Sequence, residues 1–134
     1  MRINDKIAEI EAFLSELQEI MPANFNLYLN DLKTKAACER YFEKIVESLI
    51  DLAYLIIKEK SLKAPDGDKE MFDSLANAKV IPDKLAIKLK EAKGMRNIIS
   101  HQYGNIDDEI IFESITHELI EDAQDFLHRV KRIK

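Results

Sequence analysis

Residues 40–60, with the sequence RYFEKIVESLIDLAYLIIKEK, hold the pattern from which the expected architecture follows. One apolar stripe recurs at helical spacing in this segment: Tyr41, Ile45, Leu49, Leu52 and Ile56. Further apolar residues widen the stripe beyond one face of a helix: Val46, Ile50, Ala53, Leu55 and Ile57. A helix that is apolar on two sides usually packs against neighbours on two sides. We therefore expect a long helix, ending near Lys60, at the centre of an all-α bundle.

An amphipathic segment precedes the central one. Apolar residues spaced by three and four predict a helix from residue 3 to about residue 20, which Pro22 ends. Residues 23–29 are expected to form a short connection or partial turn, after which Asn30 or Asp31 caps the central helix.

Breaker residues divide the rest of the chain into three further segments. Residues 65–68, Pro-Asp-Gly-Asp, are expected to form a turn, with Asp68 as the N-cap of a short helix. Pro82 suits the first turn of the next helix, and the acidic residues 107–109 suit the first turn of the last one. The predicted fold class is all-α: an up-and-down bundle of four main helices plus a short helix, in a single domain over residues 1–134.

Residues 96–103, Arg-Asn-Ile-Ile-Ser-His-Gln-Tyr, combine an arginine and a histidine on the fourth main segment. Arg96 lies on an apolar seam with Leu85, Leu89, Ala92, Ile99 and Tyr103. A guanidinium keeps its charge, and burying it unpaired is costly, so Arg96 requires a carboxylate, a phosphate or an open cleft. His101 follows, and histidine suits proton transfer near neutral pH. An arginine that holds a phosphate and a histidine that moves protons suffice for RNA cleavage without a metal.

Helical geometry separates these two side chains. In an unbroken helix His101 points about 140° away from Arg96, because a turn contains about 3.6 residues. The two side chains share one pocket only if the backbone leaves the helix between Ser100 and Gly104, or if a second chain completes the site. The wide apolar surface of residues 40–60 favours a homodimer, whose two-fold symmetry brings two copies of the motif together.

The spacing Arg-x4-His-x-Tyr over Arg96, His101 and Tyr103 resembles the signature of the HEPN superfamily, and more narrowly that of the HepT-like toxins of toxin–antitoxin pairs. The resemblance extends over nearly the whole chain. It implies a homodimeric, metal-independent endoribonuclease toxin with a composite cleft at the dimer interface, where Arg96 and His101 are catalytic. It also implies a nucleotidyltransferase antitoxin as partner, and Tyr103 resembles the position that such a partner modifies with AMP. Asn97 and Ser100 are expected to orient the turn beside the catalytic pair.

Asp51 is a further candidate, because it is a carboxylate flanked by apolar residues on the central helix. It faces either solvent or the active-site cleft. In the first case it lies near Lys58, which is seven residues further on and shares its helical face. The resemblance favours the cleft, although this chain has Tyr54 and Ile56 where many relatives place an asparagine and a histidine.

The charge balance restricts the classes of partner. The net charge of -5 is unusual for a protein that binds RNA, but residues 79–103 carry six cations and two anions, a local net charge of +4, so the remainder carries -9. A local basic surface attracts a polyanion even on an acidic protein, and surface lysines also serve solubility alone. RNA, rather than DNA, is the expected substrate.

The single cysteine, Cys38, excludes an intrachain disulfide and agrees with a reducing cytoplasm. The first residues contain no apolar signal region, and no apolar run reaches membrane-spanning length, so we expect a cytoplasmic protein without membrane association. No cofactor and no metal site are expected, because His117 and His128 share no ligand cluster and suit a helix surface.

Two other classes of function fit the same residues. The chain is a catalytically silent nucleotide- or partner-binding module for a nucleotidyltransferase if it cleaves no RNA but is stabilised by ATP or by that partner. It is a dimeric helical scaffold if Arg96 is paired internally with a carboxylate such as that of Asp51.

Overall fold

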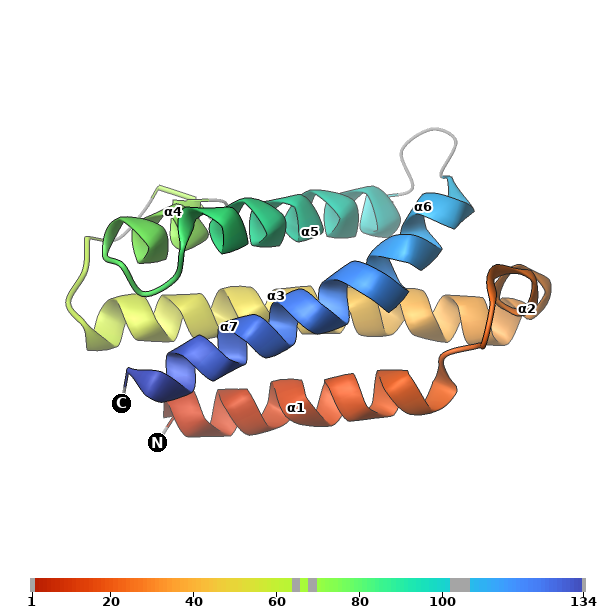
Figure 1. Ribbon diagram of the computed structural model, residues 1–134, viewed down its shortest axis with the longest axis horizontal. Coiled ribbons are helices and arrows are strands. Elements are labelled where there is room, and N and C mark those ends of the chain that lie inside the picture. The colour runs from red at the N-terminus through yellow and green to blue at the C-terminus, as the bar shows by residue number, and fades with distance from the viewer. Residues whose placement is uncertain (1, 64–65, 68–69, 102–106, 134) are drawn as a thin grey trace.

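The computed structural model describes residues 2–63, 66–67, 70–101 and 107–133, and all regular structure within them is helical (Figure 1). The helices are α1 (Arg2–Ile20), α2 (Phe25–Asn30), α3 (Leu32–Glu59), α4 (Glu70–Asn77), α5 (Asp83–His101), α6 (Asp108–Glu113), η1 (Ser114–Leu119) and α7 (Ile120–Arg132). The predicted all-α fold is therefore confirmed. The predicted turn at residues 65–68 and the N-cap role of Asp68 fall largely outside the described residues.

Four long rods form the bundle, and they run alternately in opposite directions (Figure 1). They are α1, α3, α5 and the continuous C-terminal rod made of α6, η1 and α7. The central helix α3 contacts α1 along its length and also packs on α2, α4, α5 and η1. Because it has neighbours on several sides, α3 buries the wide apolar surface that its sequence predicted.

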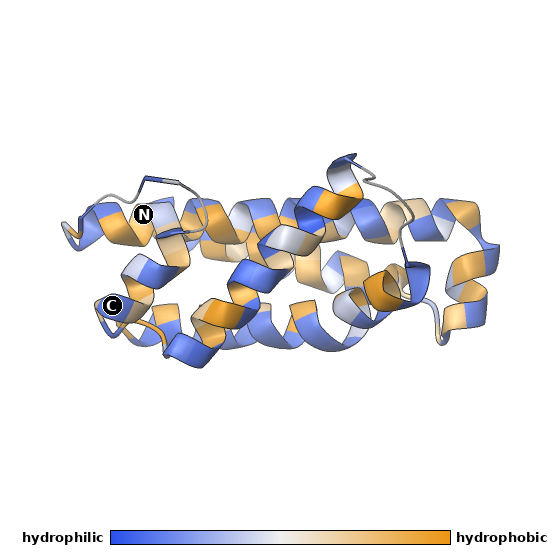
Figure 2. Ribbon diagram, turned by 90° about the horizontal axis from the view of Figure 1, so that it is seen from above, coloured by the Kyte–Doolittle hydropathy of each residue, from blue (hydrophilic) through white to orange (hydrophobic). Residues whose placement is uncertain are grey.

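The core consists of the apolar faces of these helices, whose hydrophobic and hydrophilic residues alternate along each rod (Figure 2). Phe42 of α3, Phe72 of α4 and Phe126 of α7 are among the largest fully buried side chains. The apolar residues of α3 are thus largely used within one chain, and Tyr54 is the large hydrophobic side chain that α3 exposes beyond its first turn. The surface that led us to expect a homodimer is therefore unavailable for it, and a dimer must use another face.

Helix α2 is a correction to the sequence prediction, which placed a connection or partial turn at residues 23–29. Asn24 caps the helix by accepting a hydrogen bond from the backbone N–H of Leu27 at 3.0 Å. Tyr28 is fully buried and its ring centroid lies 5.0 Å from that of Phe112 on α6. Burial raises the pKa of the Tyr28 hydroxyl. The bundle therefore has two short helices, α2 and α4, where one was predicted.

The side chains that cap α3 and α6 agree with the sequence prediction. Asp31 caps α3 by accepting from the N–H of Thr34, and Asp107 caps α6 by accepting from the N–H groups of Glu109 and Ile110. Cys38 is buried, which raises the pKa of its thiol to about 11. None of the described helices is long and apolar enough to cross a membrane.

Two helices end in a hydrogen-bonded closure that places a non-glycine residue at positive φ. After α4, the N–H of Val80 donates to the carbonyl of Leu75 and the N–H of Lys79 donates to that of Ala76, with Lys79 at φ 64°. Ser61 occupies the same position after α3, at φ 55°. This geometry is that of a Schellman motif, in which glycine is the favoured residue.

We expect Lys79→Gly to stabilise the protein by about 1 kcal/mol, because glycine removes the steric cost of the left-handed conformation at this position. The measurement is urea unfolding followed by circular dichroism. Lys79→Ala is the matched control, since it removes the charge but keeps the Cβ, and it is expected to give no such gain. Equal stability of both variants would contradict the assignment of strain to this residue.

Candidate active site

Helix α5 carries the arginine–histidine motif and remains helical through His101. Of the two alternatives left open by the sequence, a backbone that leaves the helix between Ser100 and Gly104 does not occur at Ser100 or His101. Residues 102–106, which include Tyr103 and Gly104, lie outside the described residues. Within one chain, Arg96 and His101 consequently point about 140° apart around the helix axis, from about 3.6 residues per turn.

Arg96 faces α3, and its guanidinium is held there by long contacts. Its Nη2 lies 3.8 Å from Oε2 of Glu47, and its Nη1 donates to Oδ1 of Asn97 at 3.5 Å. The Nε atom is buried and has no hydrogen-bond partner, and it is the one such side-chain atom among the described residues. The side chain is 27% exposed, so it is accessible from one side. Arg96 is thus a cation whose donors are incompletely used, which an incoming acceptor would remedy.

Ser100 makes the second contact between the motif and α3. Its hydroxyl donates to Oε2 of Glu43, one helical turn along from the contact between Arg96 and Glu47. Two carboxylates of α3 therefore stand beside two residues of the motif. Sequence analysis missed both glutamates as neighbours of the site. The signal was their spacing of four residues, which equals the spacing of Arg96 and Ser100 on the antiparallel helix.

Asp51 pairs with Lys6 and Arg96 lies beside Glu47, so the internal pair of Arg96 with Asp51 that the scaffold hypothesis named is not formed. The carboxylate of Asp51 is 54% exposed and lies 3.5 Å from the ammonium of Lys6 on α1. Its neighbour is therefore Lys6. Among the described residues, Asp51 forms no ion pair with Lys58, near which it was expected to lie. Asp51 faces the junction of α1 and α3, where Lys6 also binds Glu9 at 2.8 Å.

His101 is exposed at the C-terminal end of α5. By helical geometry it shares the outward face of α5 with Ile87, Gly94 and Ile98. Ile87 is 57% exposed and Ile98 is 39% exposed, and open space surrounds the position that a Cβ on Gly94 would occupy. An apolar face of this kind, with a glycine between the two isoleucines, suits close approach by another helix.

The basic surface predicted for residues 79–103 is partly neutralised in the fold. Lys90 donates to the carboxylate of Asp73 at 3.0 Å, and Lys88 lies 3.9 Å from Asp122. Lys84 and Lys93 form no ion pair among the described residues and remain available to a polyanion. No group of three or more potential metal-ligating side chains occurs in the described ranges.

Asp122 is a buried carboxyl group near this surface. Burial raises its pKa above the usual 3.8, as do the carboxylates of Glu121, Glu118 and Asp125, whereas Lys88 opposes the shift. A carboxyl whose folded-state pKa is raised binds more protons in the folded than in the unfolded protein, so its ionisation destabilises the fold as pH rises through that range.

We therefore expect Asp122→Asn to raise the melting temperature at pH 7, because asparagine carries no charge to be desolvated. The gain should shrink as the pH falls towards 3.8 and the wild-type carboxyl becomes protonated. Thermal melts across this pH range test it, with the exposed Glu59→Gln on α3 as control. A lower melting temperature for Asp122→Asn at pH 7 would show that the attraction to Lys88 outweighs desolvation.

An all-helical bundle that carries an arginine and a histidine at one end of a long helix fits the class of protein predicted from the motif, a helical ribonuclease. A comparison with family models agrees with this class. The model described as "Ribonuclease HepT-like" matches residues 3–130. The chain belongs to the ribonuclease HepT-like family, as its motif predicted. The predicted enzyme class, endoribonuclease, is thus confirmed.

Two relatives cover most of this chain. The "mRNA nuclease HepT" of Shewanella oneidensis is 26% identical over 129 residues, which are 96% of each chain. The "tRNA nuclease HepT" of Aphanizomenon flos-aquae is 25% identical over 118 residues, which are 87% of this chain and 80% of the relative.

Solved structures are similar over nearly the full length. A chain of a toxin–antitoxin complex with AMP-PNP has a TM-score of 0.88 at 25% identity, covering 97% of both chains. A chain of the complex between the tri-AMPylated Shewanella oneidensis HEPN toxin and the MNT antitoxin has a TM-score of 0.89 at 25% identity, covering 97% of this chain and 96% of the other.

Proposed function

We propose that this protein is the toxin of a toxin–antitoxin pair and cleaves RNA without a metal at a cleft formed by two copies of the chain. The observation that carries the proposal is the state of Arg96: a partly exposed guanidinium whose Nε is buried without an acceptor and whose other contacts are long. A phosphate can bind the exposed part of this guanidinium, because its oxygens match the donor fork of arginine. The relatives named as mRNA and tRNA nucleases support RNA as the substrate class.

The proposed reaction is attack of a ribose 2′-oxygen on the adjacent phosphorus. The bond from phosphorus to the 5′-oxygen breaks, which leaves a 2′,3′-cyclic phosphate and a free 5′-hydroxyl. His101 of one protomer accepts the proton of the 2′-hydroxyl, and the same histidine of its partner gives a proton to the leaving 5′-oxygen. Arg96 stabilises the charge that builds on the non-bridging phosphoryl oxygens.

The two copies meet, in this proposal, through the outward face of α5. Ile87 and Ile98 are exposed there, and Gly94 allows two helices to approach closely. His101 lies on the same face, so a two-fold axis near Gly94 brings the C-terminal halves of both α5 helices into one cleft. Each chain contributes one domain, residues 1–134, to this assembly.

The neutralising partner in this proposal is a nucleotidyltransferase antitoxin that transfers AMP to Tyr103. Support comes from the similar structure of a tri-AMPylated HEPN toxin bound to an MNT antitoxin. Tyr103 is two residues beyond His101 in the sequence, so an adenylyl group on it adds bulk and negative charge close to the motif. Either effect opposes the entry of RNA.

A heterodimer with one wild-type and one His101→Ala protomer tests the shared site. The two chains are co-expressed with different affinity tags, purified in sequence, and assayed on a fluorescent RNA. If both histidines serve one site, the heterodimer should lose nearly all activity. Retention of about half would mean that each protomer holds a complete site. A heterodimer containing His128→Ala, an exposed histidine of α7, is the control and should be fully active.

One observation favours a second function, that of a catalytically silent partner-binding module. Glu43 and Glu47 stand beside Ser100 and Arg96, and their charges oppose the approach of a phosphate. If this opposition prevails, the wild-type homodimer cuts no RNA but still binds its nucleotidyltransferase. Glu47→Gln then restores neither cleavage nor RNA binding, whereas an active enzyme should bind RNA more tightly with this change.

A further inference from the structure

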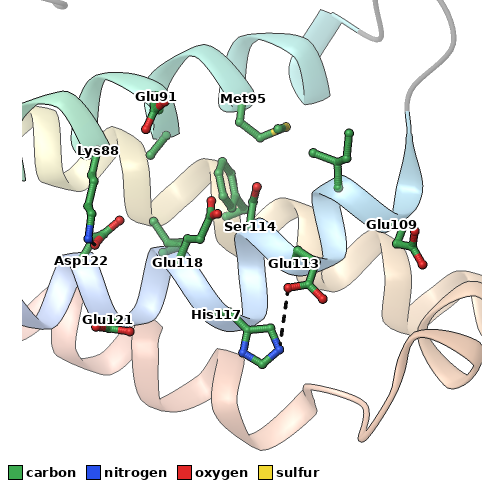
Figure 3. Close-up of a pocket in the computed structure, with 14 residues that line it drawn as sticks. Lys88, Glu91, Met95, Glu109, Glu113, Ser114, His117, Glu118, Glu121 and Asp122 are labelled. Carbon is green, nitrogen blue, oxygen red and sulfur yellow. Dashed lines mark ion pairs between the residues drawn. The ribbon is translucent and has the colours of Figure 1, made fainter.

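A groove of about 750 Å³ lies between α5 and the C-terminal rod (Figure 3), and neither Arg96 nor His101 lines it. We call it the acidic groove. Six carboxylates from both walls line it: Glu91, Glu109, Glu113, Glu118, Glu121 and Asp122. Lys88 is the one lysine or arginine that lines it, so its formal charge with neutral histidine is -5, equal to the net charge of the whole chain. The formal charges of all other residues therefore sum to zero, since -5 minus -5 is 0.

Few of these carboxylates are neutralised within the chain. Lys88 lies beside Asp122, and the exposed His117 lies 3.9 Å from Glu113 (Figure 3). The remaining carboxylates form no ion pair among the described residues: Glu91, Glu109, Glu118 and Glu121. Like charges crowded on facing walls repel one another, so a cationic occupant stabilises the groove.

The floor of the acidic groove is apolar, which distinguishes it from a simple cluster of charges. Its accessible apolar surface comes from Ala92 and Met95, which are half-buried, and from Ile110, which is 53% exposed. Phe42 and Leu119 also line it but are only 1% exposed. A hydrated metal ion or a polyamine would leave these surfaces in water. An occupant that carries both cations and an aliphatic side chain covers them and pairs with the carboxylates.

One wall of the acidic groove is a π-helix, η1, which widens the rod next to α5. The hydroxyl of Thr116 donates to the carbonyl of Phe112 at 2.8 Å and supports the irregular turn. Single π-helical turns occur frequently at functional sites. The wall that bears Ser114 and Glu118 is thus the locally irregular part of an otherwise regular rod.

We propose that the acidic groove docks a segment of a partner protein in which lysine or arginine residues flank an aliphatic side chain. The cations pair with carboxylates of both walls, and the aliphatic group rests on Met95 and Ile110. RNA does not fit, because its phosphates meet six carboxylates. A second copy of this chain is a poorer match, because each copy carries -5. The proposal goes beyond ribonuclease activity and does not depend on it.

Selection of peptides from a random library tests both the surface and the chemistry of the occupant. Displayed peptides are selected on the wild-type protein and counter-selected on Glu91→Gln/Glu118→Gln, which neutralises one carboxylate on each wall at nearly constant size. The enriched sequences should contain at least two lysine or arginine residues around an aliphatic one. Their dissociation constants, measured by fluorescence anisotropy, should rise about tenfold or more in the groove variant.

Glu19→Gln/Glu59→Gln is the matched control, since both glutamates are exposed outside the groove and their replacement changes the net charge equally. Peptides that bind the two double variants with equal affinity would overturn the proposal, as would equal binding after replacement of the aliphatic residue by serine. A change in oligomeric state of the groove variant, seen by light scattering, would show instead that a second copy covers the surface. Thermal melts confirm that both double variants are folded.

Discussion

His101→Ala should reduce the rate of RNA cleavage by a factor on the order of 10² to 10⁴, the range typical of losing a general acid or base. The structure places His101 at the exposed C-terminal end of α5, outside the buried hydrophobic core. Its removal should therefore leave the melting temperature and the oligomeric state unchanged. The measurement is single-turnover cleavage of a labelled RNA, with product ends identified by mass spectrometry.

His128→Ala serves as the control for this prediction, because His128 is also an exposed helical histidine but lies on α7. If both variants cleave RNA at the wild-type rate, His101 takes no part in the reaction. Products that carry a 3′-hydroxyl rather than a 2′,3′-cyclic phosphate would exclude the 2′-oxygen as the nucleophile.

Arg96→Ala should reduce the cleavage rate by a factor on the order of 10² to 10³, because it removes the cation that stabilises the phosphoryl oxygens. Stability should change little, since the polar contacts of Arg96 with the described part of the chain are a 3.8 Å ion pair with Glu47 and a 3.5 Å hydrogen bond with Asn97, and its buried Nε has no partner there. Arg96→Lys should not restore activity, because lysine cannot present two parallel donors to a phosphate.

The opposite pattern would identify a structural arginine. Breaking a tight buried ion pair costs about 3 to 5 kcal/mol, so a large loss of stability with retained cleavage would support the scaffold hypothesis. Lys58→Ala on α3 is the control, because Lys58 is an exposed cation outside residues 79–103 and forms no ion pair among the described residues. Cleavage and urea unfolding measured on the same preparations separate the two outcomes.

The long helices could be predicted because their apolar periodicity is local and strong. Helix α2 could not, because its stability depends on Tyr28 packing against Phe112, a residue far along the chain. The π-helical turn also escaped prediction, since the apolar spacing of the last rod fits a regular helix almost equally well.

At the site, the residues of the motif could be predicted from the sequence, but their neighbours in the fold could not. The motif marked Arg96 and His101, but side chains from other helices decide what surrounds them. Asp51 seemed the natural partner for Arg96 within the sequence of α3, yet packing of α1 gives it Lys6 instead. Glu47, one turn earlier, faces the arginine because the register between α3 and α5 is set by their whole interface.

The π-helix also fixes the phase of the C-terminal rod. A π-helical turn holds about one residue more than an α-helical turn, so removing one residue from Ser114–Leu119 would let α6 and α7 join as a single regular helix with nearly the same relative phase. Phe112 and Phe126 would then both still face inward. A single-codon deletion here should thus be tolerated, whereas the same deletion within the regular part of α7 should unfold the bundle, because it turns the residues beyond it by roughly 100°.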